Sequence, residues 1–361
     1  MNFCAYLYSR GKTMKPIQIS AIVLSYNGDK RLLPTLESCR AQTYQYKDLV
    51  IADDASTDGG RSVAVINKWL EDNAQYFTNV HFISNKTNLG IVQNFRKAAL
   101  MANGEIIFGI GQGDLYYGPD TFKILANEIR QQREKGLNDP LFWLGFYCSY
   151  SLIPSWHKVT HMASLPQHLN MLQLHPQKAL THLLRYGNFI GGSSFIYHKN
   201  YFSEDIFPLP NEIRDVEDYP ALIYMLANNK KIGQLNMFLR WYEYGTGIST
   251  SKKSIEFDLR GRNSSIAVHN WVSQLNSISK HHKKMFETIA EYQQYRSHTS
   301  RFLHAPNIFI ENLLHRGCSY LNSHNRYSNF LTNIESNSGI PFRADFMSST
   351  NLADNNRGTY L

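Results

Sequence analysis

Strand and helix signals alternate through the first third of the chain, and this alternation constrains the fold more than any other feature. Residues 19–24 are a continuous apolar, β-rich run, which is typical of a strand buried on both faces. Further strands are expected over 48–52, 80–84 and 105–110, and helices over 29–41, 61–71 and 91–103. The pattern predicts βαβ units and an α/β fold with a mainly parallel twisted sheet flanked by helices.

Clusters of polar residues follow the expected strands at the points where the strands end. They occupy residues 25–27, 53–54, 85–90 and 111–114. Ligands of open parallel sheets bind outside the carboxyl ends of the strands. We therefore expect a binding site along this edge of the sheet.

The most informative of these clusters is the segment VIADDASTDG at residues 50–59. A strand there delivers two adjacent carboxylates, Asp53 and Asp54, to a turn. Residues 56–58 are also typical of a helix N-cap, which would need no ligand. Two acids directly after a buried strand concentrate negative charge where a ligand would lie, and this favours a functional role.

Two further acidic segments follow. Asp114 comes after a strand and three nearby glycines, which let a diphosphate approach the backbone. Asp is a hard oxygen ligand that can hold Mg²⁺ or Mn²⁺ against phosphate oxygens. The segment DVED at 215–218 then opens an expected helix, where acids are also ordinary partners of the helix dipole.

Taken together, the three segments resemble the family 2 glycosyltransferases, which have the GT-A fold. The resemblance runs from about residue 17 to residue 249. Residues 53–59 look like the family's Asp-Asp-Gly-Ser-x-Asp turn, and Asn88-Leu-Gly90 with NGEII at 103–107 precedes the position of its metal motif. GGSSF at 191–195, Glu217-Asp218 and GTGIS at 245–249 are similar to its acceptor loop, its Glu-Asp pair and a later flexible loop.

The resemblance implies a role for each matching position. Asp114 would bind Mn²⁺ or Mg²⁺, Asp218 would be the general base, and Glu217 would support it or contact the acceptor. The residues that would bind the nucleotide-sugar are Ser25, Tyr26, Asn27, Asp53, Asp54, Asn88 and Gln112. The implied reaction is inverting transfer from a nucleotide-sugar, with a UDP-sugar favoured, to a hydroxyl of a saccharide or lipid-linked acceptor in surface polysaccharide or oligosaccharide synthesis.

One departure from the family concerns the metal loop. The family has Asp-x-Asp or Asp-Asp there, whereas this chain has Gly111-Gln-Gly-Asp114 and a single carboxylate. Three explanations stay open. Asp114 alone suffices with water and phosphate, which is common for Mg²⁺ and Mn²⁺. Gln112 contributes a neutral oxygen or contacts ribose. Alternatively, metal dependence is weak and catalysis is impaired.

Composition and charge bound the rest of the chain. We expect an N-terminal extension over 1–16 and a catalytic domain over 17–250, divided into a donor half (17–120) and an acceptor half (121–250). A helical segment over 251–335 and a disordered tail over 336–361 would follow. The net charge is +8, of which +5 lies beyond residue 250. That segment either rests on an anionic membrane surface, caps the catalytic domain or forms a homo-oligomer contact.

Several classes of protein are disfavoured. Four cysteines without a Cys-x-x-Cys pattern and the lack of an apolar leader indicate a reduced cytoplasmic protein, peripheral on the membrane if the basic segment binds lipid. No zinc-finger or RNA-binding signature supports nucleic acid as a partner. A nucleotidyltransferase would carry a basic, Gly-rich loop after the first strand. A non-catalytic, transferase-like binding module remains the main alternative, and the Glu217-Asp218 pair argues against it.

Overall fold

The computed structural model describes residues 15–150, 162–163, 166–243, 245, 255–295 and 297–315. Several predicted segments lie wholly or partly outside the described residues: 1–14 of the extension over 1–16, 246–249 of the loop at 245–249, 316–335 of the helical segment, and the tail over 336–361. None of the helices in the described ranges combines the length and apolar character needed to cross a bilayer.

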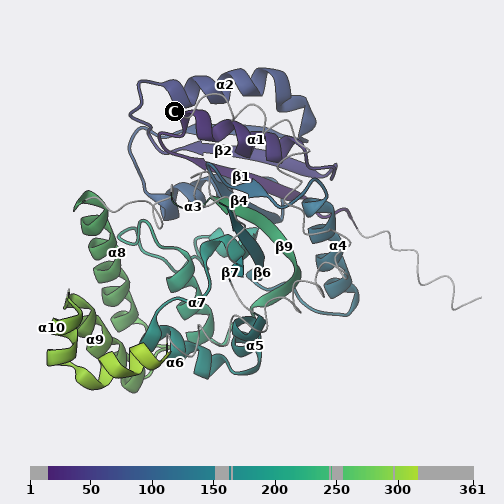
Figure 1. Cartoon of the computed structure of the whole chain (residues 1–361). Coiled ribbons are helices and arrows are strands. Elements are labelled where there is room, and N and C mark those ends of the chain that lie inside the picture. The colour runs from purple at the N-terminus through teal and green to yellow at the C-terminus, as the bar shows by residue number, and fades with distance from the viewer. Residues whose placement is uncertain are drawn as a thin grey trace, which may run out of the picture.

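A nine-stranded sheet runs through the middle of the molecule (Figure 1), in the order β3-β2-β1-β4-β8-β6-β9-β5 with β7 paired to β6. Its first four strands are parallel, β8 is antiparallel to β4 and β6, and β9 is parallel to β6. The strands are β1 Ile19–Ser25, β2 Lys47–Asp53, β3 Val80–Ser84, β4 Ile106–Gly111, β5 Leu115–Tyr116, β6 Phe142–Tyr150, β7 Met162–Ala163, β8 Phe195–His198 and β9 Gly233–Glu243. The predicted α/β sheet of the GT-A type is confirmed.

Helices cover both faces of this sheet. Residues of α1, α2 and α4 share one hydrophobic core with the sheet, and residues of α3, α6 and α7 share the other. The helices are α1 Leu32–Arg40, α2 Arg61–Asn73, α3 Ile91–Met101, α4 Thr121–Glu134, α5 Pro166–Leu174, α6 Pro176–Tyr186, α7 Asp218–Ala227, α8 Ile255–Gln274, α9 Lys280–Gln294 and α10 His298–His304. A further helix spans residues 306–315.

The central strand β1 shows why the sequence has a continuous apolar run. Ile19, Ala21 and Val23 lie in the core beneath α1 and α2, and Ile22 lies in the core on the opposite face. All four side chains are fully buried. Alternate residues of a strand point to opposite faces, so a strand covered on both sides is apolar at most positions. The exception within 19–24 is Ser20, whose buried hydroxyl donates to Asp48 Oδ1 at 2.6 Å.

Helices α8, α9 and α10 lie together at the lower left of Figure 1, on the side of the molecule away from α1 and α2. They follow the last strand of the sheet, as the predicted helical segment requires. The domain boundaries themselves stay predictions.

Truncation of the central strand should destabilise the fold. Ile22→Ala removes a fully buried side chain and should lower the free energy of unfolding by about 2–5 kcal/mol. Chemical denaturation measures this loss. Leu100→Ala on α3 is the control, since Leu100 is 46% exposed and its truncation should cost no more than about 0.5 kcal/mol. Equal losses would show that Ile22 does not lie in the core.

Candidate active site

The carboxyl ends of six strands meet at one edge of the sheet. β1, β2, β3 and β4 are parallel, and β6 and β9 run in the same direction because β8 is antiparallel to both β4 and β6. Since β8 runs the other way, the segment that leads into it, Gly191–Ser194, lies at this same edge. The edge therefore gathers segments that are far apart in the sequence, as predicted.

Asp53 ties together the loops that follow β1 and β2. It is 1% exposed and accepts hydrogen bonds from Ser25 Oγ at 3.2 Å and from the backbone N–H of Ser56 at 3.0 Å. The Ser56 hydroxyl in turn accepts from the Asn27 backbone N–H at 2.8 Å. Asn27 has φ +50°, a conformation that asparagine tolerates. These hydrogen bonds hold the loops after β1 and β2 together at the carboxyl edge of the sheet.

Asp54 shapes the loop after β3. Its carboxylate accepts from Asn85 Nδ2 at 3.1 Å and from the backbone N–H groups of Leu89 at 2.8 Å and Gly90 at 2.9 Å. Asn88 is held through its own amide, which donates to the Asp54 carbonyl at 3.2 Å. The Asp54 carboxylate thus has three protein donors, and its contact with a nucleotide stays a prediction.

Ala55 explains one feature of the acidic turn. It lies between Asp54 and Ser56 with φ +59°, a left-handed conformation that costs a residue with a Cβ roughly 1–2 kcal/mol. Glycine pays no such cost, which accounts for glycine at this place in the motif that the turn resembles. Backbone strain of this kind is concentrated at functional sites.

Gln112 joins the metal loop to the loop after β1. Its Oε1 accepts from the backbone N–H of Tyr26 at 2.9 Å, and its Nε2 donates to the Tyr26 carbonyl at 2.8 Å. Both ends of the amide are therefore bound to one backbone unit. The Tyr26 ring is 39% exposed, so this pair presents an aromatic face at the edge, suited to stack on a base.

Asp114 lies beside a second carboxylate that comes from β9. Asp114 Oδ1 accepts from the backbone N–H of Glu243 at 2.9 Å. Arg31 holds the Glu243 carboxylate, donating to Oε2 from Nε at 3.0 Å and from Nη2 at 2.7 Å. A Cβ on Gly113 would lie 1.8 Å from this oxygen. Glycine is therefore required at position 113 because the Glu243 carboxylate packs against its backbone.

A buried arginine compensates the charge of Asp114. Burial raises the pKa of Asp114 to about 7, and the Glu243 charge raises it too, while Arg240 and Arg31 oppose these effects. Arg240 is 5% exposed and donates to the carbonyls of Gly109 and Phe195. Oδ2 of Asp114 accepts no hydrogen bond within the described residues. A single hard oxygen is thus available to a divalent cation.

The acid pair Glu217-Asp218 lies at the start of α7. A Cβ on Gly192 would lie 2.8 Å from Glu217 Oε1 and 3.6 Å from Asp218 Oδ2, so both carboxylates lie against this glycine. Asp218 accepts from the Tyr219 backbone N–H at 2.7 Å. Burial raises the pKa of both acids, and the Asp218 charge raises that of Glu217 further. Such a carboxylate takes up a proton more readily than an exposed one.

Tyr147 connects the acid pair with Asp114. Burial raises the pKa of its hydroxyl, and the charges of Asp218 and Asp114 both add to the effect. The Tyr147 hydroxyl would lie 2.5 Å from a Cβ on Gly191, and Tyr147 pairs with Arg240 across β6 and β9. Asp114 and Asp218 therefore both lie near Tyr147 at the same edge of the sheet, where Tyr147 is paired with Arg240.

Residues 20–143 match the sequence model of the glycosyl transferase family 2. This part of the chain is similar to the family 2 glycosyltransferases. The predicted family resemblance is thereby confirmed. A curated relative, the putative glycosyltransferase EpsE of Bacillus subtilis (strain 168), is 31% identical over 90 residues, which are 25% of this chain and 31% of EpsE. The match thus spans under a third of that relative's length.

Solved structures agree with this family 2 fold. S. aureus TarS 1-349 in complex with UDP-GlcNAc aligns with a TM-score of 0.53 at 17% identity, over 80% of this chain and 76% of that one. The same TarS fragment in complex with UDP aligns with a TM-score of 0.51 at 16% identity, over 79% of this chain and 74% of that one. At such identities the likeness shows the fold alone.

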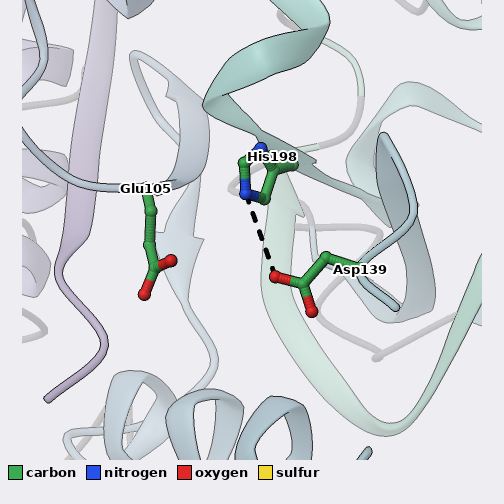
Figure 2. Close-up of side chains that lie close together, drawn as sticks. All are labelled: Glu105, Asp139 and His198. Carbon is green, nitrogen blue, oxygen red and sulfur yellow. Dashed lines mark ion pairs between the residues drawn. The ribbon is translucent and has the colours of Figure 1, made fainter. Parts of the chain in front are cut away.

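A second group of side chains that could bind a metal ion lies elsewhere in the fold. Single ligand atoms of Glu105, Asp139 and His198 lie within 4.8 Å of one another. Figure 2 shows His198 facing Asp139, and their Nε2 and Oδ2 atoms are 3.8 Å apart. Arg133 already donates to Glu105 Oε2 at 2.9 Å and to Asp139 Oδ1 at 3.1 Å. The two carboxylates thus share one guanidinium in an ion-pair cluster, which offsets part of their charge.

This cluster is also far from the candidate active site. Glu105 directly precedes β4, and His198 pairs with Ile106, the first residue of that strand. The six residues of β4, at about 3.3 Å per residue, separate the cluster from Asp114 by roughly 20 Å. The cluster therefore cannot serve the diphosphate end of the active site.

All the predicted site residues lie at the carboxyl edge of the sheet, on its loops or on the start of α7, and their ligand contacts stay predictions. Sequence reasoning missed four residues that the structure adds: Arg31, Tyr147, Arg240 and Glu243. Glu243 and Arg240 lie in β9, where the sequence has no recognised motif. Nothing local to Glu243 indicated a role at the site. A charged residue within an otherwise apolar strand was the available signal for Arg240.

Gly113→Ala should disturb the Asp114 loop without affecting the core. Its Cβ would overlap the Glu243 carboxylate at a φ of +92° and should displace the Arg31–Glu243 pair. We expect the metal-dependent rise in melting temperature caused by nucleoside diphosphate to be lost or strongly reduced.

The matched control is Gly118→Ala, because a Cβ there has no heavy atom within 4 Å. This variant should keep the full nucleotide-dependent shift, measured by thermal denaturation with and without Mn²⁺. An unchanged shift in Gly113→Ala would show that Glu243 and Asp114 do not act together.

Proposed function

We propose that the protein is an inverting glycosyltransferase that moves a sugar from a nucleoside-diphosphate sugar to an acceptor hydroxyl. The observation that carries the proposal is that Asp114 and the Glu217-Asp218 pair lie at one carboxyl edge of the sheet, both near Tyr147 and Arg240. The family 2 match of residues 20–143 supports it. A UDP-sugar is the favoured donor, because TarS, which shares the fold, binds UDP and UDP-GlcNAc.

In this proposal the donor lies along the ends of β1, β2 and β4. The Tyr26 ring stacks on the base, while the loops fixed by Asp53, Asp54 and Gln112 enclose the nucleoside. Asp114 Oδ2 would hold Mn²⁺ or Mg²⁺, and the metal would neutralise the charge of the leaving diphosphate. Arg31, 29% exposed, lies beside this loop and adds a fixed positive charge.

Asp218 acts as the base. Its carboxylate accepts the proton of the acceptor hydroxyl as that oxygen attacks the anomeric carbon. Glu217 supports Asp218 or contacts the acceptor. Attack from the side opposite the diphosphate inverts the anomeric centre. By analogy with the family, the acceptor is a growing saccharide, free or lipid-linked, of a surface polysaccharide or oligosaccharide.

The alternative is a non-catalytic binding module that has lost its metal site. The binding-module hypothesis rests on Gly111 and Gly113, which occupy positions where the family has acids. The packing of the Glu243 carboxylate against Gly113 gives that glycine a structural reason. An acid pair whose pKa is raised by burial also favours the enzyme over the binding module.

Asp218→Asn tests the assignment of the base. An amide cannot accept the proton, so kcat should fall by about 10²–10⁴-fold while donor affinity stays nearly unchanged. Steady-state kinetics of sugar transfer and thermal shifts with nucleotide measure the two effects. Asp205→Asn, in an exposed turn, is the control and should keep full activity. Full activity in Asp218→Asn would refute the assignment, and lost donor binding would make Asp218 a structural residue.

The pH dependence of transfer provides an independent check. A base must be ionised to act, and burial raises the pKa of Asp218 and Glu217. We therefore expect kcat/KM to rise with pH, with a midpoint above the usual carboxyl range of about 3.9–4.3. The rise should disappear in Asp218→Asn. A flat profile for the unmodified enzyme from about pH 5 to about pH 8 would contradict a buried carboxylate base.

A further inference from the structure

Five large apolar side chains are exposed on the last two described helices, α10 and 306–315. We call them the apolar face: Phe302, Leu303, Ile310, Leu313 and Leu314. Their exposure ranges from 46% to 71%. Ile310, Leu313 and Leu314 are spaced i, i+3 and i+4, so they form one stripe on their helix. The Phe302 and Phe309 rings meet edge to face at 5.7 Å and link the two helices.

These helices contribute little to the core of the protein. No residue of α10 is buried. Helix 306–315 contacts α6 through Glu311, which accepts from Arg185 and from the Tyr186 hydroxyl. It also contacts α6 through His315, whose ring stacks on Tyr186 and lies 2.9 Å from His182 Nε2. Neither helix supplies a residue to the candidate active site. A solvated helix pair with clustered apolar side chains is typical of an interaction surface.

A cavity of about 210 Å³ adjoins the apolar face and is lined by Arg185, Tyr292, Arg301, Asn312 and Leu313, among others. Leu313 belongs to both features, and Arg301 is next to Phe302 in the sequence. Arg301 Nε donates to a backbone carbonyl, and its guanidinium lies 5.5 Å from the centre of the Tyr292 ring. Within the described residues no carboxylate pairs with Arg301.

We propose that the apolar face docks on an anionic lipid surface and that the adjoining cavity receives a headgroup phosphate. Amphipathic helices bind membranes by burying apolar side chains at the headgroup boundary while cationic groups meet anionic lipids. Arg301 supplies the cation at the rim, and Arg185 lines the same cavity. A symmetric contact between two copies would instead bring like charges together, which disfavours a dimer.

The test is co-sedimentation of the full-length protein with vesicles of phosphatidylcholine alone and of phosphatidylcholine mixed with phosphatidylglycerol. We expect binding only to the anionic vesicles, weakened by salt. Leu313→Ser combined with Leu314→Ser should weaken partition about tenfold or more. Arg301→Gln should weaken it about fivefold. The leucine variant should keep the melting temperature of the unmodified protein, because both side chains are exposed. Arg301→Gln loses a hydrogen bond to the Tyr295 carbonyl, so its partition is measured well below its own melting temperature.

The matched control combines Leu33→Ser with Leu100→Ser, two leucines that are 43% and 46% exposed on α1 and α3. It should sediment like the unmodified protein. Equal loss in the control, or equal binding to neutral vesicles, would overturn the proposal. So would a concentration-dependent dimer that Leu313→Ser with Leu314→Ser abolishes without any vesicle binding. Stabilisation by inorganic phosphate without vesicle binding would instead make the cavity a site for a soluble anion.

Discussion

The buried charge of Arg240 is the constraint on which the site depends. Removing a guanidinium from water costs several kcal/mol unless the surroundings compensate it. Here the carbonyls of Gly109 and Phe195 accept its hydrogen bonds, and the charges of Asp114 and Glu217 stabilise its protonated form. One side chain thus joins β4, β8 and β9 and lies near two acids from distant segments. Its positive charge in turn offsets part of the cost of burying Asp114 and Glu217.

The fold was largely predictable because its determinants are local. β1 is a mostly apolar run since helices cover both its faces, and β3 begins and ends where the pattern predicted.

The surroundings of Asp114 were only half predictable. Glu243 lies 129 residues beyond Asp114, and Arg31 lies 212 residues before Glu243. No local pattern carries such a pairing, because it arises only when β9 has joined the sheet beside β6 and β5.

Motifs located the site more reliably than they assigned individual side chains. Asp53, Asp54 and Gln112 all lie at the expected edge of the sheet, yet their polar side-chain atoms form hydrogen bonds with neighbouring loops. A carboxylate that accepts several backbone N–H groups is held in one position, so it can shape a pocket without touching its ligand. The sequence cannot distinguish an acid that shapes the pocket from one that contacts the ligand, since both require an acid at the same position. The structure distinguishes them by the number of protein donors around each carboxylate oxygen.

The single carboxylate of the metal loop follows from the same packing. A side chain at position 113 is excluded by the Glu243 carboxylate, so a second acid has no room there. Arg31 balances Glu243, and Arg240 faces Asp114. The loop therefore presents nearly equal numbers of fixed positive and negative charges. Under the proposed function, fewer carboxylates would mean less repulsion toward a donor that carries a diphosphate, and the guanidinium groups together with a bound metal would stabilise the leaving group. On the proposed function, one aspartate is then enough because the site is less negative than a two-acid loop would make it.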